Sequence, residues 1–237
     1  MNPRTSWKLR LFGALGAAML LCPVVAQADL SSGSLTSMNG GVTAANKWAE
    51  EPFFKITWNI TDNHNGTLHY VYTLSADNGD PLTKSVSHML LQVSDNFTLA
   101  DLIEPSIDPA SGDPRTYQPG AMGNSNPQLP GNIFGLKFDG SGSTLLTLSF
   151  DSDRAAMWGN FYAKGGANGE VPTAWNKDFM VNVADPYNFS GAFDAQGNAL
   201  CKIAVPDTKT PVAPAPAAMA LGLLGLGLVG WVKRRLA

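Results

Sequence analysis

Two neighbouring stretches of this chain, residues 53–61 and 67–76, alternate strictly between apolar and polar side chains, and this pattern constrains the fold more than any other. The apolar positions are Phe54, Ile56, Trp58 and Ile60 in the first stretch, and Leu68, Tyr70, Tyr72 and Leu74 in the second. Successive side chains of a strand point to opposite faces, so each stretch is predicted to be a strand with one buried face. Turn-forming residues fill positions 62–66, and the three segments together predict a β-hairpin.

Further runs of strand-forming residues recur along the chain, separated by clusters of Gly, Asn, Asp and Pro. They span residues 86–93, 133–138, 144–150, 157–164, 179–184 and 200–205. Only residues 97–103 suggest a helical turn or two, and no long helical period occurs between the two ends of the chain. The expected fold is therefore all-β, an antiparallel β-sandwich or jelly roll formed by residues 29–206 as one domain.

The first 28 residues have the three parts of a secretory signal peptide. Its basic start contains Arg4, Lys8 and Arg10. An apolar run follows over residues 11–22, and Ala26 and Ala28 form a small-residue site that predicts cleavage before Asp29. We therefore expect export through the Sec translocon, with the basic start left in the cytoplasm.

The C-terminal end is predicted to be a single transmembrane helix with a basic end, residues 217–237, after a Pro/Ala-rich linker, residues 207–216. Residues 217–232 carry no charge. As a helix they would span roughly 24 Å, slightly less than a hydrocarbon core of about 30 Å. Lys233, Arg234 and Arg235 follow, and we expect them to stop transfer by remaining at the cytoplasmic headgroups. Glycines weaken the helix, so the segment suits either a permanent anchor or a helix that a processing enzyme removes.

The layout of this tail resembles the PEP-CTERM sorting signal of Gram-negative bacteria. Pro214, Ala215 and Pro216 stand where that family has Pro-Glu-Pro, and the Gly-Leu run of residues 221–230 matches its apolar helix. The resemblance implies processing by an exosortase, a membrane enzyme, and an intermediate anchored in the inner membrane. It also implies delivery to the cell surface or the extracellular matrix. A second segment, residues 157–166 (MWGNFYAKGG), is similar to a segment of other exported proteins with this type of tail.

The part of the chain between the two ends is strongly acidic. Of the 16 lysines and arginines, three lie in the signal peptide and three in the basic end, which leaves ten beside all 19 aspartates and glutamates. This excess of negative charge argues against nucleic acid as a partner, because nucleic-acid binding requires a basic face. Cys201 is the one cysteine that remains after removal of the signal peptide, so the exported part can form no internal disulfide.

Signals for catalysis and metal binding are weak. No Gly-x-Ser-x-Gly segment occurs, and the three histidines, His64, His69 and His88, show no metal-binding spacing. Residues 77–80 and 151–153 offer oxygen ligands for Ca²⁺, although turn chemistry explains both. The tryptophans Trp48, Trp58, Trp158 and Trp175 could stack on sugars or fill the core. The Pro/Gly-rich residues 104–132 could form a ligand loop or a surface excursion without chemistry.

We therefore expect an exported protein of the cell surface or extracellular matrix, with a structural or adhesive role in the polymer layer and no enzymatic activity. No catalytic residue, metal ligand or cofactor is assigned. The alternative is a polysaccharide-binding module assisted by Ca²⁺. A hydrolase acting on the same polymer through a pair of carboxyl groups is a third hypothesis.

Overall fold

The computed structural model of the chain describes residues 29–110, 112–120, 126–166 and 169–207. The predicted signal peptide, with Ala26 and Ala28, and the C-terminal linker from residue 208 lie outside these residues. The sorting motif, the predicted membrane helix and the basic residues also lie outside them: Pro214, Ala215, Pro216, Lys233, Arg234 and Arg235. Within the described residues, no helix has the length and apolarity needed to cross a membrane.

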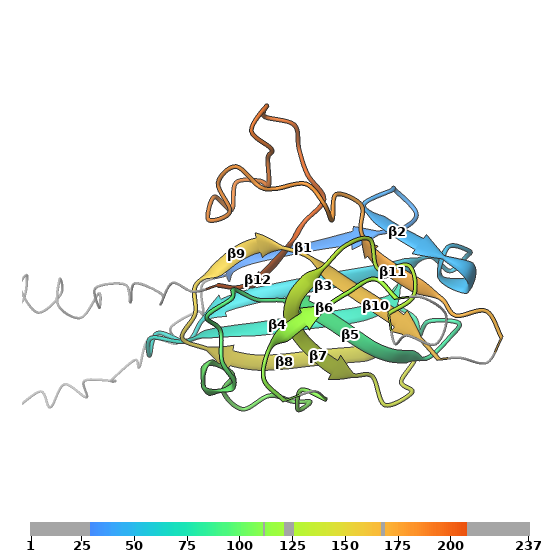
Figure 1. Cartoon of the computed structure of the whole chain (residues 1–237), viewed down its shortest axis with the longest axis horizontal. Coiled ribbons are helices and arrows are strands. Elements are labelled where there is room, and N and C mark those ends of the chain that lie inside the picture. The colour runs from blue at the N-terminus through green and yellow to red at the C-terminus, as the bar shows by residue number, and fades with distance from the viewer. Residues whose placement is uncertain (1–28, 111, 121–125, 167–168, 208–237) are drawn as a thin grey trace, which may run out of the picture.

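The described residues form three antiparallel β-sheets (Figure 1). The four-stranded sheet has the order β1 (Asp29–Thr36), β3 (Phe54–Asp62), β4 (Leu68–Ala76), β8 (Leu146–Ser152). The six-stranded sheet has the order β2 (Val42–Ala45), β11 (Thr173–Asn176), β10 (Phe161–Gly165), β5 (Val86–Gln92), β7 (Ile133–Asp139), β6 (Arg115–Tyr117). A small sheet pairs β12 (Ile203–Pro206) with β9 (Ala156–Gly159). The prediction of an all-β, antiparallel fold is confirmed.

The two larger sheets share one hydrophobic core, an arrangement consistent with a β-sandwich. Phe54 of β3 stacks on Phe161 of β10 at 6.2 Å between ring centroids, and Phe138 of β7 stacks on Phe150 of β8 at the same distance. Each pair joins one large sheet to the other. The core thus consists of the inward positions of the alternating strands, as the period of two requires.

The predicted hairpin is present with the predicted alternation. Strands β3 and β4 pair from Phe54 opposite Ala76 to Asp62 opposite Leu68, and the inward residues of both strands are buried. The turn between them contains Gly66 with a φ of 93°, a conformation that glycine adopts without a steric penalty.

Three details of the sequence prediction are wrong. Residues 157–164 do not form one strand, because the chain leaves the small sheet after β9 and enters the six-stranded sheet at β10, with Asn160 between them. Residues 179–184 form turns instead of a strand, with the Val181 N–H donating to the Asp178 carbonyl at 3.0 Å. The last strand begins at Ile203 and not at residue 200. Strands β1, β2, β6 and β11 were not predicted, and the expected helical turn is the short 3₁₀ helix η2 (Leu99–Asp101).

Candidate binding surface

The long Pro/Gly-rich segment, residues 104–132, contributes strand β6 to the six-stranded sheet, and its residues 126–129 lie over the outer face of that sheet. Tyr117 and Leu129 from this segment pack with sheet residues and with Phe179 in a second apolar cluster on that side. The cluster also contains Leu90, Ile133 and Tyr162 of strands β5, β7 and β10, all of which are buried. The described part of the segment is therefore an ordered cover over this face, not an open ligand loop.

Polar groups under the cover are paired with the segment that lies over them. His88 Nε2 lies 2.9 Å from Asn126 Oδ1, and the Tyr162 hydroxyl donates to the Pro127 carbonyl at 2.6 Å. Burial lowers the pKa of His88 to about 4, and the charges of Lys137 and Lys164 act in the same direction. The imidazole is therefore neutral at physiological pH, which suits a buried contact between the sheet and its cover.

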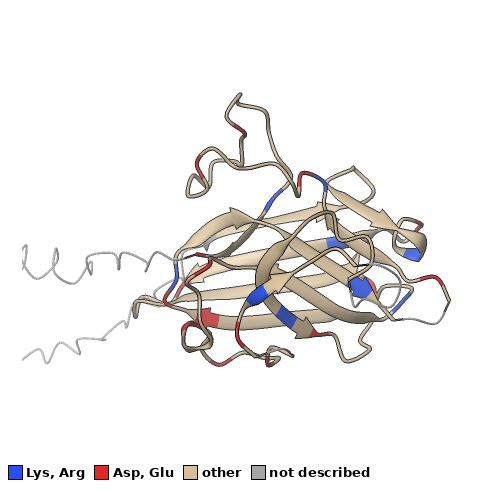
Figure 2. Ribbon diagram, viewed as in Figure 1, with Lys and Arg blue, Asp and Glu red and all other residues tan. Residues whose placement is uncertain are grey.

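Basic residues occur on strands β6, β7 and β10 of the six-stranded sheet, where Figure 2 colours their positions blue: Arg115, Lys137 and Lys164. Arg115 of β6 lies over the Tyr117 ring, with its guanidinium carbon 5.2 Å from the ring centroid. Burial lowers the pKa of Lys137, and the positive charges of Lys164 and Arg115 lower it further. The outer surface of this sheet thus carries local positive charge within an acidic chain.

The outer face of the four-stranded sheet has a different character, because hydroxyl and amide side chains line it. We call this surface the hydroxyl face; it consists of Ser32, Ser34, Thr57, Asn59, Thr73, Thr147 and Ser149. All seven side chains are exposed or half-buried. They lie outside because their apolar neighbours in sequence point into the core.

The strand register aligns these side chains in rows across the sheet. One row runs from Ser34 to Thr57, Thr73 and Thr147, with one residue from each of the four strands. The Thr73 and Thr147 hydroxyl oxygens are 3.3 Å apart. Because neighbouring strands lie about 4.8 Å apart, the row presents hydroxyl groups at a regular spacing. This row and the row on one side of it, which contains Asn59, Val71 and Ser149, include no charged residue, whereas the row on the other side contains Lys55.

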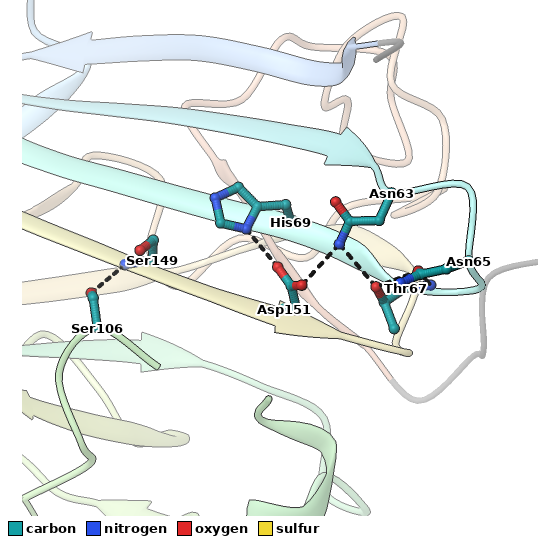
Figure 3. A network of polar contacts seen from close by, with 7 residues as sticks. All are labelled: Asn63, Asn65, Thr67, His69, Ser106, Ser149 and Asp151. Atoms are coloured by element: carbon teal, nitrogen blue, oxygen red, sulfur yellow. Dashed lines mark hydrogen bonds and ion pairs between the residues drawn. The ribbon is translucent and has the colours of Figure 1, made fainter. Parts of the chain in front are cut away.

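A polar network closes the hydroxyl face at the end where the hairpin turns (Figure 3). His69 of β4 lies opposite Asp151 of β8, and its Nδ1 is 2.5 Å from the Asp151 carboxylate. Asn63 donates to the second oxygen of that carboxylate and to the Thr67 hydroxyl, both at 2.9 Å. The Thr67 hydroxyl in turn donates to Asn65 at 2.7 Å. The network therefore fixes the hairpin turn against strand β8.

No serine hydroxyl joins His69 in this network among the described residues, where His69 has a hydrogen bond to Asp151. Ser149 and Ser106, which are also drawn in Figure 3, are joined to each other by the Ser149 N–H donating to the Ser106 hydroxyl at 2.8 Å. That bond attaches the start of the covering segment to the edge of the four-stranded sheet.

The predicted calcium ligands lie in two separate places. Asn78 donates to Asp80 at 2.8 Å within its own turn, as turn chemistry predicts. Asp151 is part of the polar network, and Asp153 lies beside Arg154. Across the described ranges, no three His, Cys, Asp or Glu side chains meet in a way that could hold a metal ion.

The four tryptophans that were considered for stacking on sugars all contact the protein, and two of them are buried. Trp48 and Trp58 are buried, with relative exposures of 0% and 6%. The Trp158 indole donates to the Asn188 carbonyl at 2.9 Å, and its ring meets Trp58 edge-on. Trp175 packs against the cluster beneath the cover. The sequence did not reveal the hydroxyl face, although the polar positions of β3 and β4 were its signal.

A comparison of the chain with protein families, curated proteins and solved structures finds no match.

Proposed function

We propose that this chain is an exported protein of the cell surface or extracellular matrix that adheres to polysaccharide of the surrounding polymer layer. The observation that supports this best is the open hydroxyl face of the four-stranded sheet, whose central row of Ser34, Thr57, Thr73 and Thr147 carries no charge. The role is structural or adhesive, and no enzymatic step is involved.

The chemistry of this face suits a neutral, hydroxylated polymer. Charged side chains must lose tightly bound water before a polymer can cover them, and this costs free energy unless an opposite charge replaces the water. Hydroxyl and amide groups exchange hydrogen bonds with water for hydrogen bonds with sugars, each with a small net gain. Such contacts are individually weak, so adhesion would depend on many of them along one polymer.

The predicted targeting segments complete the proposal. A signal peptide over residues 1–28 would direct the chain to the Sec translocon, and an exosortase would act at Pro214, Ala215 and Pro216 on an intermediate held by Lys233, Arg234 and Arg235. The described ends favour this arrangement, because the start of β1 and the end of β12 lie at the same end of the molecule (Figure 1). A domain tethered at that end would keep the hydroxyl face accessible.

The adhesion proposal is tested by co-sedimentation of the full chain with matrix polysaccharide from the host. We expect Thr73→Lys to reduce the bound fraction several-fold, because it places a hydrated charge in the central row. Thr116→Lys is the matched control, since Thr116 is exposed on β6 of the other sheet. Equal binding by both variants and the wild type would rule out the hydroxyl face. Loss of binding on addition of a chelator would instead favour the calcium-assisted alternative.

The targeting proposal is tested by the mass of the protein in the host surface fraction. We expect a form that begins near Asp29 and lacks the Gly-Leu helix, because a short helix rich in glycine is a poor permanent anchor. Replacement of Lys233, Arg234 and Arg235 by alanine should reduce the membrane-bound intermediate. Recovery of only full-length C-termini ending at Ala237 would contradict processing.

A further inference from the structure

A buried lysine precedes the last strand and has no acidic partner in contact. Lys202 is 4% exposed, and none of the ion pairs among the described residues includes it. Its Nζ donates to Asn160 Oδ1 at 2.8 Å and, at 3.4 Å, to the Phe179 carbonyl. A buried amine of this kind is costly to keep charged, so its environment favours the neutral form.

The asparagine that faces this amine is held rigidly. Asn160 lies between β9 and β10, where the chain changes sheets, and its backbone N–H donates to Gln92 Oε1 at 2.8 Å. Its side-chain oxygen also accepts a hydrogen bond from Asn176 Nδ2 at 2.9 Å. Asn176 is itself fully buried and accepts from the Phe161 N–H at 3.1 Å.

This geometry activates both reaction partners. Asn176 Nδ2 donates to the side-chain carbonyl oxygen of Asn160, and a fixed donor of this kind stabilises the negative charge that grows there during nucleophilic attack. Burial lowers the pKa of Lys202 to about 8, against the opposing charge of Asp178, so part of the amine is neutral near physiological pH. The two groups are in contact before any reaction, and fixed proximity of reactants can replace a large part of an activation barrier.

We propose that Lys202 and Asn160 join in an intramolecular isopeptide bond. The Lys202 nitrogen attacks Asn160 Cγ, a new C–N bond forms, and the bond between Cγ and Nδ2 breaks. One proton of the attacking amine passes to the departing nitrogen, which leaves as ammonia. No oxidant, metal or cofactor is needed, since the reaction exchanges one amide for another.

Such a bond would give this domain a covalent cross-link that its cysteine content does not allow. Cys201 is the free cysteine of the described residues, so no disulfide ties them together. The isopeptide bond would connect the start of β12 to the junction of β9 and β10 and close the chain between residues 160 and 202. It would therefore secure the strand that directly precedes the C-terminal tail. The proposal depends on this buried pair and not on polysaccharide binding.

The test is peptide mapping of the purified full chain by mass spectrometry after incubation in the folded state at pH 8. We expect one species that contains the peptides of both Asn160 and Lys202 and is lighter than their sum by one ammonia. The cross-linked fraction should form faster as the pH is raised from 6 to 9, because more of the amine is neutral. Recovery of both residues in separate, unmodified peptides would overturn the proposal, as would Asn160 deamidated to aspartate without a link.

Two variants make the assignment specific. Lys202→Arg keeps the positive charge but removes the nucleophile, so the cross-linked species should disappear. Lys137→Arg is the matched control on the six-stranded sheet and should leave the amount of the cross-linked species unchanged. Asn160→Asp keeps the shape of the side chain, and a link in that variant should release water instead of ammonia. A cross-linked species that persists in Lys202→Arg would assign the bond to another residue and overturn the proposal.

Discussion

The two large sheets of this domain differ in how their outer faces meet the surroundings. The outer face of the six-stranded sheet carries large apolar side chains such as Leu90 and Tyr162, and a long segment of the chain buries them. The outer face of the four-stranded sheet carries hydroxyl and amide groups such as Thr57 and Thr73, which remain accessible. A sheet that is apolar on both faces needs a cover on each side, whereas a sheet that alternates between apolar and polar needs only one.

The two outer faces therefore contribute differently to stability and to recognition. Side chains under the cover contribute to the stability of the fold through burial, in the same way as a second core. Side chains on the hydroxyl face contribute little burial, so their identity is free to serve recognition. Substitutions of equal size on the two faces should therefore have unequal effects on stability.

The largest effect is expected for Tyr162→Ala on the covered face. Tyr162 has no exposed surface, and its removal leaves a cavity and a Pro127 carbonyl without its donor. We expect a loss of about 4 kcal/mol in the free energy of unfolding, measured by denaturant unfolding. Thr73→Ala, the comparison on the hydroxyl face, should cost less than about 1 kcal/mol.

Similar losses of stability in Tyr162→Ala and Thr73→Ala would contradict this difference between the two faces. Tyr162→Phe separates packing from hydrogen bonding, because it keeps the ring and removes the hydroxyl. Its loss of stability should be the smaller part of the Tyr162→Ala effect, about 1 kcal/mol, the net contribution of a typical hydrogen bond. A Tyr162→Phe variant as unstable as Tyr162→Ala would place the stabilisation in the hydroxyl and not in the ring.

The sequence predicted the hairpin of β3 and β4 well because their alternation is a local property of the chain. Strand β1 was missed because two of its inward positions, Ser31 and Gly33, are small; an added Cβ at Gly33 would overlap the Trp58 ring. Serine and glycine in sequence indicate a loop, and only the packing of that indole explains them as a strand. Strands β2, β6 and β11 have three or four residues each, which is too short for a periodic signal.

The candidate surfaces were less predictable than the fold for a related reason. The polar positions of β3 could be assigned to an outer face from the sequence, but their rows depend on the order of β1, β3, β4 and β8. The contact between Lys202 and Asn160 joins residues distant in sequence. It also depends on the break between β9 and β10, where a single strand was predicted. Long-range pairing of this kind leaves no pattern in one sequence.

A smaller effect, confined to the covered face, is expected when the pH is lowered. His88 has a pKa of about 4 in the folded protein, because of its burial and of Lys137 and Lys164, against about 6.5 when unfolded. Between these two values the unfolded chain binds more protons, so stability falls as the pH drops from 6.5 towards 4. The full change corresponds to about 3 kcal/mol.

This prediction is measured by denaturant unfolding of the wild type and of His88→Gln at pH 7 and pH 4.5. The introduced glutamine cannot take up a proton but can still donate to Asn126, so the variant should lose much less stability on acidification than the wild type. Asp139 lies opposite His88 in the strand register, and its carboxyl group is present in both proteins. His69→Gln is the matched change on the four-stranded sheet. Its stability should fall on acidification as much as that of the wild type, because His88 is intact. If the stability of His88→Gln falls as steeply on acidification as that of the wild type, the acid sensitivity does not arise from the covered face. The two faces then do not differ in this respect.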